Sequence, residues 1–403
     1  MAILVINCGS SSVKFAVFEQ GSAEALVTGI VDQIGSANVG GSYKLNDGTK
    51  QKITCQVGAD HTAVLAAILD ALKADEALQN VAITAVGHRV VHGGEKFAEP
   101  VLIDADVLAG IRELSSLAPL HNPANADGIE AASTLFPGVP QVAVFDTAFH
   151  QTIPPHVFRY AVPDALYHEH NVRRYGFHGT SHDYVSAETI RKYDLDPVRA
   201  KVLVAHLGNG CSATAVVGGR SCDTTMGITP LEGLMMGTRS GNVDPNLHSY
   251  LAENTGMSLD EITEMLNKKS GFAGLSGISN DLRELAVAYE EGHGGARLAV
   301  EVFCFRLARE LAGLTVSLDG VPDAIAFTGG IGENSKLVRE KTVRYLKFLG
   351  CELDVARNEV NGGDSNGVIS VEGSKGPLIA VVATNEELAI AEATAEVAQP
   401  EGN

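Results

Sequence analysis

Four short turns, each following an apolar stretch that we interpret as a strand, carry the residues best suited to chemistry. They read NCGSSSVK (7–14), HLGNGCS (206–212), FTGGIGENS (327–335) and TNEE (384–387). Turns at the carboxyl ends of strands are where α/β sheets place ligands. Glycine and serine there let backbone N–H groups and hydroxyls approach phosphate oxygens closely. One such turn is usually only a turn, but four in one chain indicate a phosphate-binding site.

The turns do not match the two commonest nucleotide-binding motifs. There is no Walker A sequence and no GxGxxG after a strand, which disfavours a P-loop NTPase and a Rossmann dehydrogenase. Hairpins and glycine turns from two duplicated domains, the actin-like arrangement, are the remaining way to hold a nucleotide. Lys14, alone between two apolar strands, would then supply a counter-charge to phosphate.

Histidines at i,i+4 spacing raise the question of a zinc site. His88 and His92 form one such pair, and His178 and His182 form another. Neither segment is HExxH, and no cysteine or carboxylate completes a ligand set, so zinc is not expected.

An internal repeat organises the elements that must position these turns. The stretch ILVINCGSSSVKFAVF (3–18) resembles VLVAHLGNGCSATAVV (202–217) at a shift of 199 residues. Leu4 then matches Leu203, Gly9 matches Gly208 and Ala16 matches Ala215, and Val5 and Val17 likewise match Val204 and Val216. Because half the chain separates the copies, we predict a duplicated domain, each copy opening with a strand, a tight turn and a returning strand.

The remaining elements alternate between strands and helices. Strands are expected at 83–94 and 140–146, and helices at 61–78, 102–123 (stopped by Pro119 and Pro123) and 296–318. The segment after Pro322 predicts a strand, a glycine turn and a helix, and the last segment predicts a strand, a turn and a helix. This alternation indicates an α/β protein whose sheets are covered on both faces.

Composition limits the class of protein and its partners. The chain has 403 residues, of which 45% are hydrophobic and 20% charged, so two or more globular domains are expected. The net charge of −19 argues against nucleic acid or an anionic membrane as partner. Six cysteines without zinc-like spacing indicate reduced thiols of a cytoplasmic protein. No signal peptide or membrane span is expected.

The motifs together resemble those of the acetate kinase family. Besides NCGSSSVKF, HLGNGCSATAV and FTGGIGENS, the resemblance rests on GHRVVHGG, VFDTAFHQTIP, YGFHGTSH and MGTRSGNVDP, and it runs from residue 3 to about residue 392. It implies a duplicated two-domain actin-like (ribonuclease H-like) ATPase fold with an interdomain cleft. We place domain I at 1–148 plus 386–403 and domain II at 149–385. The implied reaction is ATP + acetate ⇌ ADP + acetyl phosphate, with Mg²⁺ or, as a substitute, Mn²⁺, in a homodimer.

The resemblance also implies roles for individual residues. Arg89 would bind the acceptor carboxylate, Arg239 would stabilise the transferring phosphoryl group, and His178 would stabilise the transition state. Asn7 and Glu386 would be the Mg²⁺ ligands, partly through water; Mg²⁺ prefers oxygen ligands and keeps several waters. Asp146 would be catalytic. Because a carboxylate acceptor is already ionised at pH 7, no general base is required, and we expect Asp146 to orient an arginine or a metal-bound water.

Two further groups complete the expected site. The acceptor's methyl group would meet an apolar pocket with a neighbouring positioning histidine: Val91, Leu120, Phe177, Pro230 and His121. ATP would be bound by Ser10, Ser12, Lys14, His206, Leu207, Gly208, Asn209, Gly210, Asp281, Leu282, Arg283, Gly329, Gly330, Ile331, Gly332 and Glu333. Asp281 could equally be a helix cap with no role in binding.

Three alternatives to an acetate kinase differ in what they require of the chain. A propionate or butyrate kinase would differ only in pocket volume, since an apolar pocket discriminates one methylene by about 1–3 kcal/mol. An actin- or Hsp70-like ATP switch would need no carboxylate and would carry a protein-binding surface. A sugar kinase should have polar side chains where this chain has Val91, Leu120, Phe177 and Pro230.

Overall fold

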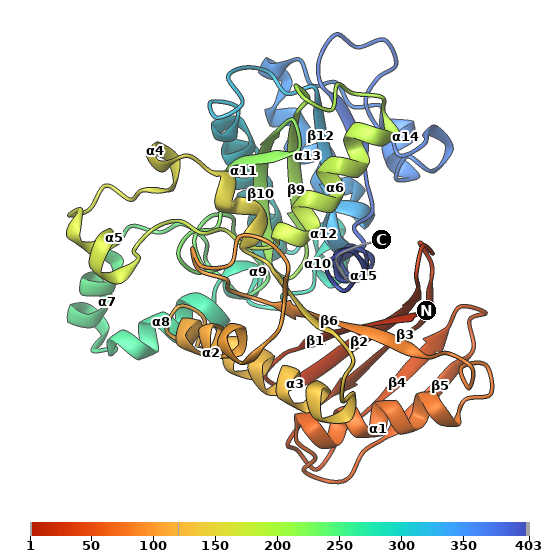
Figure 1. Cartoon of the computed structure of the whole chain (residues 1–403). Coiled ribbons are helices and arrows are strands. Elements are labelled where there is room, and N and C mark those ends of the chain that lie inside the picture. Colours follow the sequence, from red (N-terminus) through yellow and green to blue (C-terminus); the bar gives the residue numbers. More distant parts are fainter. Residues whose placement is uncertain (1, 120, 400–403) are drawn as a thin grey trace. The chain divides into compact units, whose positions relative to one another are not determined.

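The computed structural model describes residues 2–119 and 121–399. Contacts between Cα atoms divide the chain into two compact units. The N-terminal unit comprises the chain up to Phe149 and the segment from Asn385 onward, and the central unit comprises His150–Thr384. Each is described by itself below (Figure 1).

The described part of the N-terminal unit forms an eight-stranded sheet in the order β5-β4-β3-β2-β1-β6-β8-β7. Its strands are β1 (Ala2–Cys8), β2 (Ser12–Glu19), β3 (Ala25–Asp32), β4 (Gly40–Leu45), β5 (Lys50–Thr54), β6 (Ile83–Val90), β7 (Val101–Leu102) and β8 (Gln141–Phe145). Its helices are α1 (His61–Ala74), α2 (Ala105–Glu113), α3 (Asn122–Leu135) and α15 (Glu386–Val397). Strands β1, β6 and β8 are parallel to one another, whereas β1 to β5 form an antiparallel meander.

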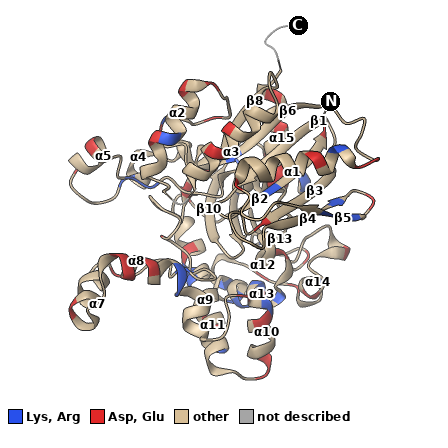
Figure 2. Cartoon of the chain, turned by 90° about the horizontal axis from the view of Figure 1, so that it is seen from below, with Lys and Arg blue, Asp and Glu red and all other residues tan. Residues whose placement is uncertain are grey.

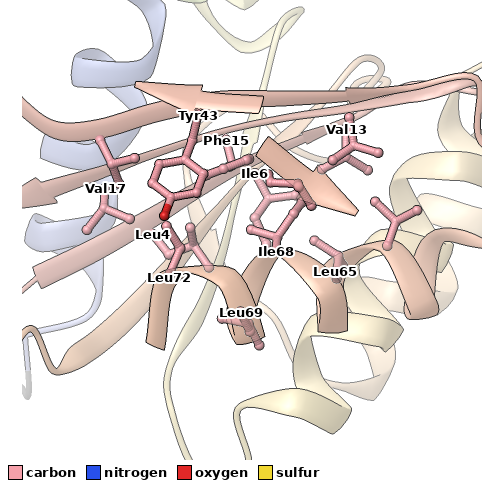
Figure 3. Packing of buried hydrophobic residues seen from close by; sticks show 14 of the residues in the cluster. Leu4, Ile6, Val13, Phe15, Val17, Tyr43, Leu65, Ile68, Leu69 and Leu72 are labelled. Carbon is pink, nitrogen blue, oxygen red and sulfur yellow. The ribbon is translucent and has the colours of Figure 1, made fainter. Parts of the chain in front are cut away.

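Helices cover both faces of this sheet where the parallel strands lie. On one face, alternate residues of β1 and β2 pack against the apolar side of α1 (Figure 3). Leu4 and Ile6 from β1 meet Leu65 and Ile68 from α1, and all four side chains are buried. On the other face, α15 packs against β1, β6 and β8. Because side chains alternate along a strand, this second face receives the odd-numbered residues of β1.

The central unit has a five-stranded sheet in the order β11-β10-β9-β12-β13 among its described residues. The strands are β9 (Lys201–Leu207), β10 (Cys211–Val217), β11 (Arg220–Thr224), β12 (Ala324–Thr328) and β13 (Leu378–Val381). The helices are α4 (Pro155–Phe158), α5 (Ala165–His170), α6 (Gly179–Lys192), α7 (Leu247–Thr255), α8 (Leu259–Lys268), α9 (Gly271–Ser276), α10 (Leu282–Glu290), α11 (Gly294–Leu314), α12 (Gly329–Asn334), α13 (Lys336–Tyr345) and α14 (Val355–Glu359). Figure 2 shows acidic segments on α8 and α10 and basic ones on α13.

The two sheets share one topology, which confirms the predicted duplication. In each, an antiparallel hairpin (β1-β2 or β9-β10) continues into a third antiparallel strand on one side. On the other side, the first hairpin strand pairs in parallel with β6 or β12, which pairs in parallel with β8 or β13. The predicted α/β class with alternating elements is therefore confirmed.

The ungapped alignment of the repeat is wrong in the returning strand. Cys8 pairs with Val13 across the first hairpin, whereas Leu207 pairs with Cys211 across the second, so the second turn is one residue shorter. Strand pairing therefore matches Val17 with Ala215, not with Val216. The identities at Ala16 and Val17 were coincidences of two apolar strands, whereas the matches in the first strand and at Gly9 hold.

Several predicted boundaries were also wrong. Pro123 does not end a helix; it stands at the start of α3, where a missing N–H costs nothing. The segment predicted as one helix over 102–123 contains α2, a short 3-10 turn and the beginning of α3. The GGIGEN stretch is the short helix α12 rather than an open turn. The helix predicted over 61–78 ends at Ala74, and that over 296–318 ends at Leu314.

The described residues contain no helix with the length and hydropathy needed to cross a bilayer. All six cysteines are free, in agreement with the expected reduced thiols.

Candidate active site

Strand alternation brings four predicted site residues of the N-terminal unit to one face of the sheet. Leu4, Ile6 and Cys8 point to the α1 side, so Asn7 points to the α15 side. Lys14 is paired with Asn7 across the hairpin and shares that face. Val90 and Phe145, their sequence neighbours, are buried in the cluster on the opposite face of the sheet. By the same alternation, Arg89 and Asp146 point to the α15 side. The carboxyl ends of β1, β6 and β8 thus carry Asn7, Arg89 and Asp146, and Lys14 lies near the start of β2, paired with Asn7.

Arg89 is held in a two-pronged contact with Asp146. The Arg89 Nε donates to one carboxylate oxygen at 2.9 Å and the Nη2 donates to the other at 2.5 Å. The Asp146 side chain is 2% exposed and the Arg89 side chain 22% exposed. A third, longer contact joins Arg89 Nη1 to the Asn7 Oδ1 at 3.4 Å. Burial opposes the charge on Arg89, but Asp146, with Glu386 nearby, holds the pKa of Arg89 above its usual range.

Glu386 begins α15, whose N-terminus lies on this same face. Asn385 caps the helix by accepting the Leu388 N–H at 3.1 Å, and a carboxylate in the first turn is favoured by the helix dipole. Burial raises the pKa of Glu386, although Arg89 opposes the shift, and Asp146 and Glu387 add to it. The carboxyl group is therefore a base with an unfavourable environment for its charge, which a bound cation would relieve.

The oxygen donors of this face fit a hard divalent cation. Asn7 offers an amide oxygen and Glu386 a carboxylate, the donor types that Mg²⁺ prefers. Both oxygens of Asp146 accept from Arg89, which leaves Asp146 less suited to direct coordination. No group of three or more His, Cys, Asp or Glu side chains gathers as a metal site in the part of the chain that the structure describes. Two protein ligands with several waters are consistent with Mg²⁺, which dehydrates reluctantly.

Two buried asparagines of α3, absent from the sequence prediction, connect the strand ends. Asn125 donates to the Cys8 carbonyl at 2.7 Å and accepts the Val91 N–H at 3.0 Å. Asn122 accepts the His92 N–H at 3.1 Å and donates to the His92 carbonyl at 3.0 Å. Asn125 therefore ties the chain just after Asn7 to the chain just after Arg89. Buried polar groups satisfied in this way specify a single local geometry.

In the central unit, His178 and Arg239 meet at the β9-β10 turn. A Cβ added to Gly210 would lie 3.5 Å from the His178 Nε2 and 3.6 Å from the Arg239 Nη1. His178 caps α6 in the left-handed region, with φ 57°, which is costly for a residue with a side chain. The Arg239 Nη1 donates to the Pro230 carbonyl at 3.2 Å, and burial lowers the pKa of Arg239. A histidine and a cation thus flank one glycine.

His206 belongs to a network of hydroxyl groups rather than standing alone. Its Nδ1 lies 2.8 Å from the Ser181 Oγ, which is also 2.8 Å from the Thr384 Oγ1. The His206 ring packs against the His178 ring in a tilted arrangement, with centroids 4.4 Å apart. The turn predicted to bind phosphate, 206–212, and the TNEE turn are therefore linked through α6.

A cavity of about 780 Å³ in the central unit collects residues predicted for ATP binding. Its lining includes Gly208, Asn209, Asp281, Leu282, Arg283, Gly330 and Ile331 from the predicted set. Asn280 also lines it and donates to the Asn209 Oδ1 at 3.0 Å. Asp281 does cap α10, accepting the Arg283 N–H at 2.8 Å, so the structural alternative for Asp281 is present.

Glu333 is engaged with the backbone of its own turn. Its Oε1 accepts the Gly329 N–H at 3.0 Å and the Thr384 N–H at 3.3 Å. The fully buried Arg339 binds the same segment by donating to the Gly332 carbonyl at 2.8 Å and to the Glu333 carbonyl at 3.0 Å. Glu333 therefore joins two of the four predicted turns, and Arg339 was not found from the sequence.

The residues predicted around the acceptor's methyl group lie in both units. Val91 is buried at the end of β6 in the N-terminal unit, and Phe177 is buried beside His178 in the central unit. Pro230 is partly buried in the loop that accepts from Arg239. Leu120 lies outside the described residues. His121 precedes α3 at its N-cap position without a side-chain capping bond.

Comparisons with family models, curated proteins and solved structures all find acetate or propionate kinases. The family model described as the acetokinase family matches residues 2–392. An acetate kinase from Ectopseudomonas mendocina is 52% identical over 389 residues, covering 96% of this chain and 97% of that protein. The structure of Porphyromonas gingivalis acetate kinase matches with a TM-score of 0.92 at 42% identity, covering 99% of this chain and 100% of that one. A propionate kinase structure from Francisella tularensis matches with a TM-score of 0.91 at 45% identity, covering 98% of this chain and 99% of that one.

Proposed function

Because the chain belongs to the acetokinase family, we propose that it transfers the γ-phosphoryl group of ATP reversibly to the carboxylate of acetate. An acetate oxygen attacks the γ-phosphorus, the bond from that phosphorus to the ADP oxygen breaks, and acetyl phosphate and ADP result. Acetate is ionised at neutral pH, so the transfer needs positioning and charge neutralisation but no proton removal.

We assign the binding of the acceptor to Arg89. Its guanidinium binds the acetate carboxylate, and Asp146 orients it. Support comes from the two contacts at 2.9 and 2.5 Å, which use the Nε and one Nη2 hydrogen of Arg89 and leave other N–H groups for a carboxylate. Val91, Leu120, Phe177 and Pro230 contact the methyl group, and His121 positions the acceptor.

The donor side belongs to the central unit and the first hairpin. The 780 Å³ cavity holds the nucleoside, and its lining includes Asp281, Arg283, Gly330 and Ile331. Arg239 and His178 donate to the equatorial oxygens of the phosphoryl group in flight, where negative charge is spread. Ser10, Ser12 and Lys14 bind phosphate oxygens of the nucleotide, as do the backbone N–H groups of 206–210.

The metal of the reaction is Mg²⁺, for which Mn²⁺ can substitute. Asn7 and Glu386 hold it, in part through water, because they supply the oxygen donors of the α15 face. When bound, the ion neutralises charge on the nucleotide phosphates. Burial raises the pKa of Glu386, so the metal site loses its carboxylate at a higher pH than an exposed glutamate would.

The observation that carries this proposal is the Arg89–Asp146 pair at the carboxyl ends of β6 and β8. An ATP switch without an acceptor has no need of an arginine clamped in this way. The deciding experiment is a hydroxamate assay with MgATP and, in parallel, acetate, propionate, butyrate or glycerol. We expect hydroxamate to form fastest with acetate. ADP release that is independent of any carboxylate would overturn the proposal and favour the switch.

Propionate is the second candidate acceptor. The specific observation in its favour is the match to the Francisella tularensis propionate kinase structure at 45% identity. One methylene is worth about 1–3 kcal/mol in an apolar pocket, so both acids should react and their kcat/KM values should differ by roughly 10- to 200-fold. A higher kcat/KM for propionate than for acetate would exchange the two assignments without changing the mechanism.

Assembly and location are proposed on the same basis. We propose a homodimer, as the family resemblance implies, and light scattering after size exclusion would measure its mass directly. A cytoplasmic location is supported by six free cysteines, which are typical of a reducing compartment.

A further inference from the structure

Three side chains of the central unit form a chain of hydrogen bonds that ends at the partly buried His178. The Ser212 Oγ lies 2.9 Å from the His178 Nδ1 and 2.6 Å from the His182 Nε2. Ser212 and His182 are fully buried. A serine hydroxyl carries a single hydrogen, so Ser212 cannot donate to both rings. The direction of these bonds therefore decides which nitrogen of each histidine carries a proton.

We propose that His182 and Ser212 fix His178 in the tautomer that carries its proton on Nε2. In this arrangement the His182 Nε2–H donates to Ser212, and the Ser212 hydroxyl donates to the His178 Nδ1. The proton of neutral His178 is then on Nε2, the nitrogen beside Gly210. Ser212 and His182 are positioning residues for the His178 role given under the proposed function, on which this inference rests.

The other possible arrangements each leave a buried hydrogen without an acceptor. The His182 Nδ1 has no hydrogen-bond partner among the described residues. If the bonds ran the opposite way, His182 would carry its hydrogen on that nitrogen, and a buried donor without an acceptor costs about 1–3 kcal/mol. If both rings donated to Ser212, its hydroxyl hydrogen would lack an acceptor instead. The proposed direction satisfies the donors of His182 and Ser212 and directs the His178 Nε2–H toward the place beside Gly210.

The surroundings of His182 agree with a neutral ring. Burial, with His150 and His206 nearby, holds the pKa of His182 well below its usual range. A neutral imidazole has one N–H, so its tautomer has a defined consequence for its partner. The groups that face His182 through ring contacts are His150, His178 and His206.

The result matters because of where the His178 Nε2 lies. A Cβ on Gly210 would be 3.5 Å from this nitrogen and 3.6 Å from the Arg239 Nη1. An N–H there gives the phosphoryl oxygens a second donor beside the guanidinium, whereas the opposite tautomer would present a lone pair and repel them. Donors fixed before the reaction cost no reorganisation during it.

The direct test is ¹⁵N NMR of histidine-labelled protein without ligands, with the His178 signals assigned by loss in a His178→Gln variant. We expect His178 to show a protonated Nε2 and an unprotonated Nδ1. A protonated Nδ1 would overturn the proposal. Because this measurement needs no turnover, it stands even if the hydroxamate assay refutes the acyl-transfer reaction.

Variants separate the relay from mere packing. Ser212→Ala should produce a mixture of His178 tautomers and lower kcat about 10- to 100-fold, with the KM for acetate within about twofold. Ser186→Ala is the matched control, because Ser186 is also fully buried, lies on α6, and donates to the Asp183 carbonyl. It should leave kcat and the tautomer unchanged. Ser212→Ala with wild-type kcat and an unchanged His178 tautomer would refute the relay.

The conservative variant tests the direction of the bonds. In His182→Gln the side-chain amide nitrogen reaches the place of Nε2 and still donates to Ser212, so the His178 tautomer and most of the kcat should be retained. His182→Met removes the donor at similar volume and should resemble Ser212→Ala. Equal kcat in the two His182 variants would contradict the proposed role of the His182 N–H.

Discussion

Replacing Asp146 by asparagine tests whether the carboxylate serves to orient Arg89. The substitution keeps the shape but turns one acceptor oxygen into an N–H donor, which then faces an Arg89 donor at a site where Asp146 is 2% exposed. A hydrogen bond to a charged group contributes about 1.5–3 kcal/mol. Losing one of the two bonds should therefore lower kcat/KM for acetate about 10- to 150-fold. Because the arginine binds the acceptor in both ground and transition states, much of the loss should appear as a higher KM for acetate.

The assay is hydroxamate formation at saturating MgATP with acetate varied, repeated at saturating acetate with MgATP varied. Asp127→Asn is the matched control, since Asp127 also pairs with an arginine, Arg112 at 3.2 Å, but on the surface of the same unit. Exposed pairs contribute about 0–1 kcal/mol, so this control should stay within about threefold of the wild type. Equal, small losses in the two variants would refute the orienting role, and a rise in the KM for MgATP alone would place Asp146 with the nucleotide instead.

Three further predictions concern groups whose burial sets their effect. Because burial raises the pKa of Glu386, the folded state binds the Glu386 proton more tightly than the unfolded state, and the stability that this binding contributes falls as the pH rises through the pKa of Glu386 in the folded state. Glu386→Gln should therefore raise the Tm of the metal-free protein at pH 7, measured by calorimetry, while lowering Mg²⁺-dependent activity. A lower Tm would contradict this sign. Asn125→Ala leaves the Cys8 carbonyl and the Val91 N–H unpaired, which costs roughly 2–6 kcal/mol of the free energy of unfolding. The Tm of the N-terminal unit should therefore fall by at least about 4 °C. An unchanged Tm would mean that water replaces the amide. Arg339→Met removes the donors to the Gly332 and Glu333 carbonyls, so it should lower both the Tm and the nucleotide affinity measured by calorimetric titration. A lower Tm with unchanged nucleotide affinity would mean that Arg339 contributes to stability alone.

Local pattern predicted the strands and their ends, whereas the family resemblance supplied the roles proposed for the residues that stand there. Asn7, Arg89 and Asp146 stand where apolar strands end, and strand alternation alone places them on one face once the strands are parallel. Gly9 and Gly208 were found because they occupy the same place in the two copies of the repeat. The duplicated hairpin followed from the same pattern.

What the sequence did not predict depends on contacts between distant elements. Asn122 and Asn125 look like ordinary helix residues until the strand ends that they connect are known. Ser212 reads as one of several small residues in a strand, and its partners come from α6, 30 and 34 residues away. Pro123 was misread as a helix stop because a proline in the first turn of a helix and one after a helix look alike in sequence.

The shorter second turn has a consequence for how the two halves diverged. Cross-strand pairing makes His206 and Ser212 the counterparts of Asn7 and Lys14, so the same two positions of an ancestral hairpin survive in both copies. The difference of one residue is confined to the loop, so the strand ladder keeps the side chains at these positions on the same face. The first copy carries an amide and an exposed lysine at these two positions, whereas the second carries a buried histidine and a buried serine on the same scaffold.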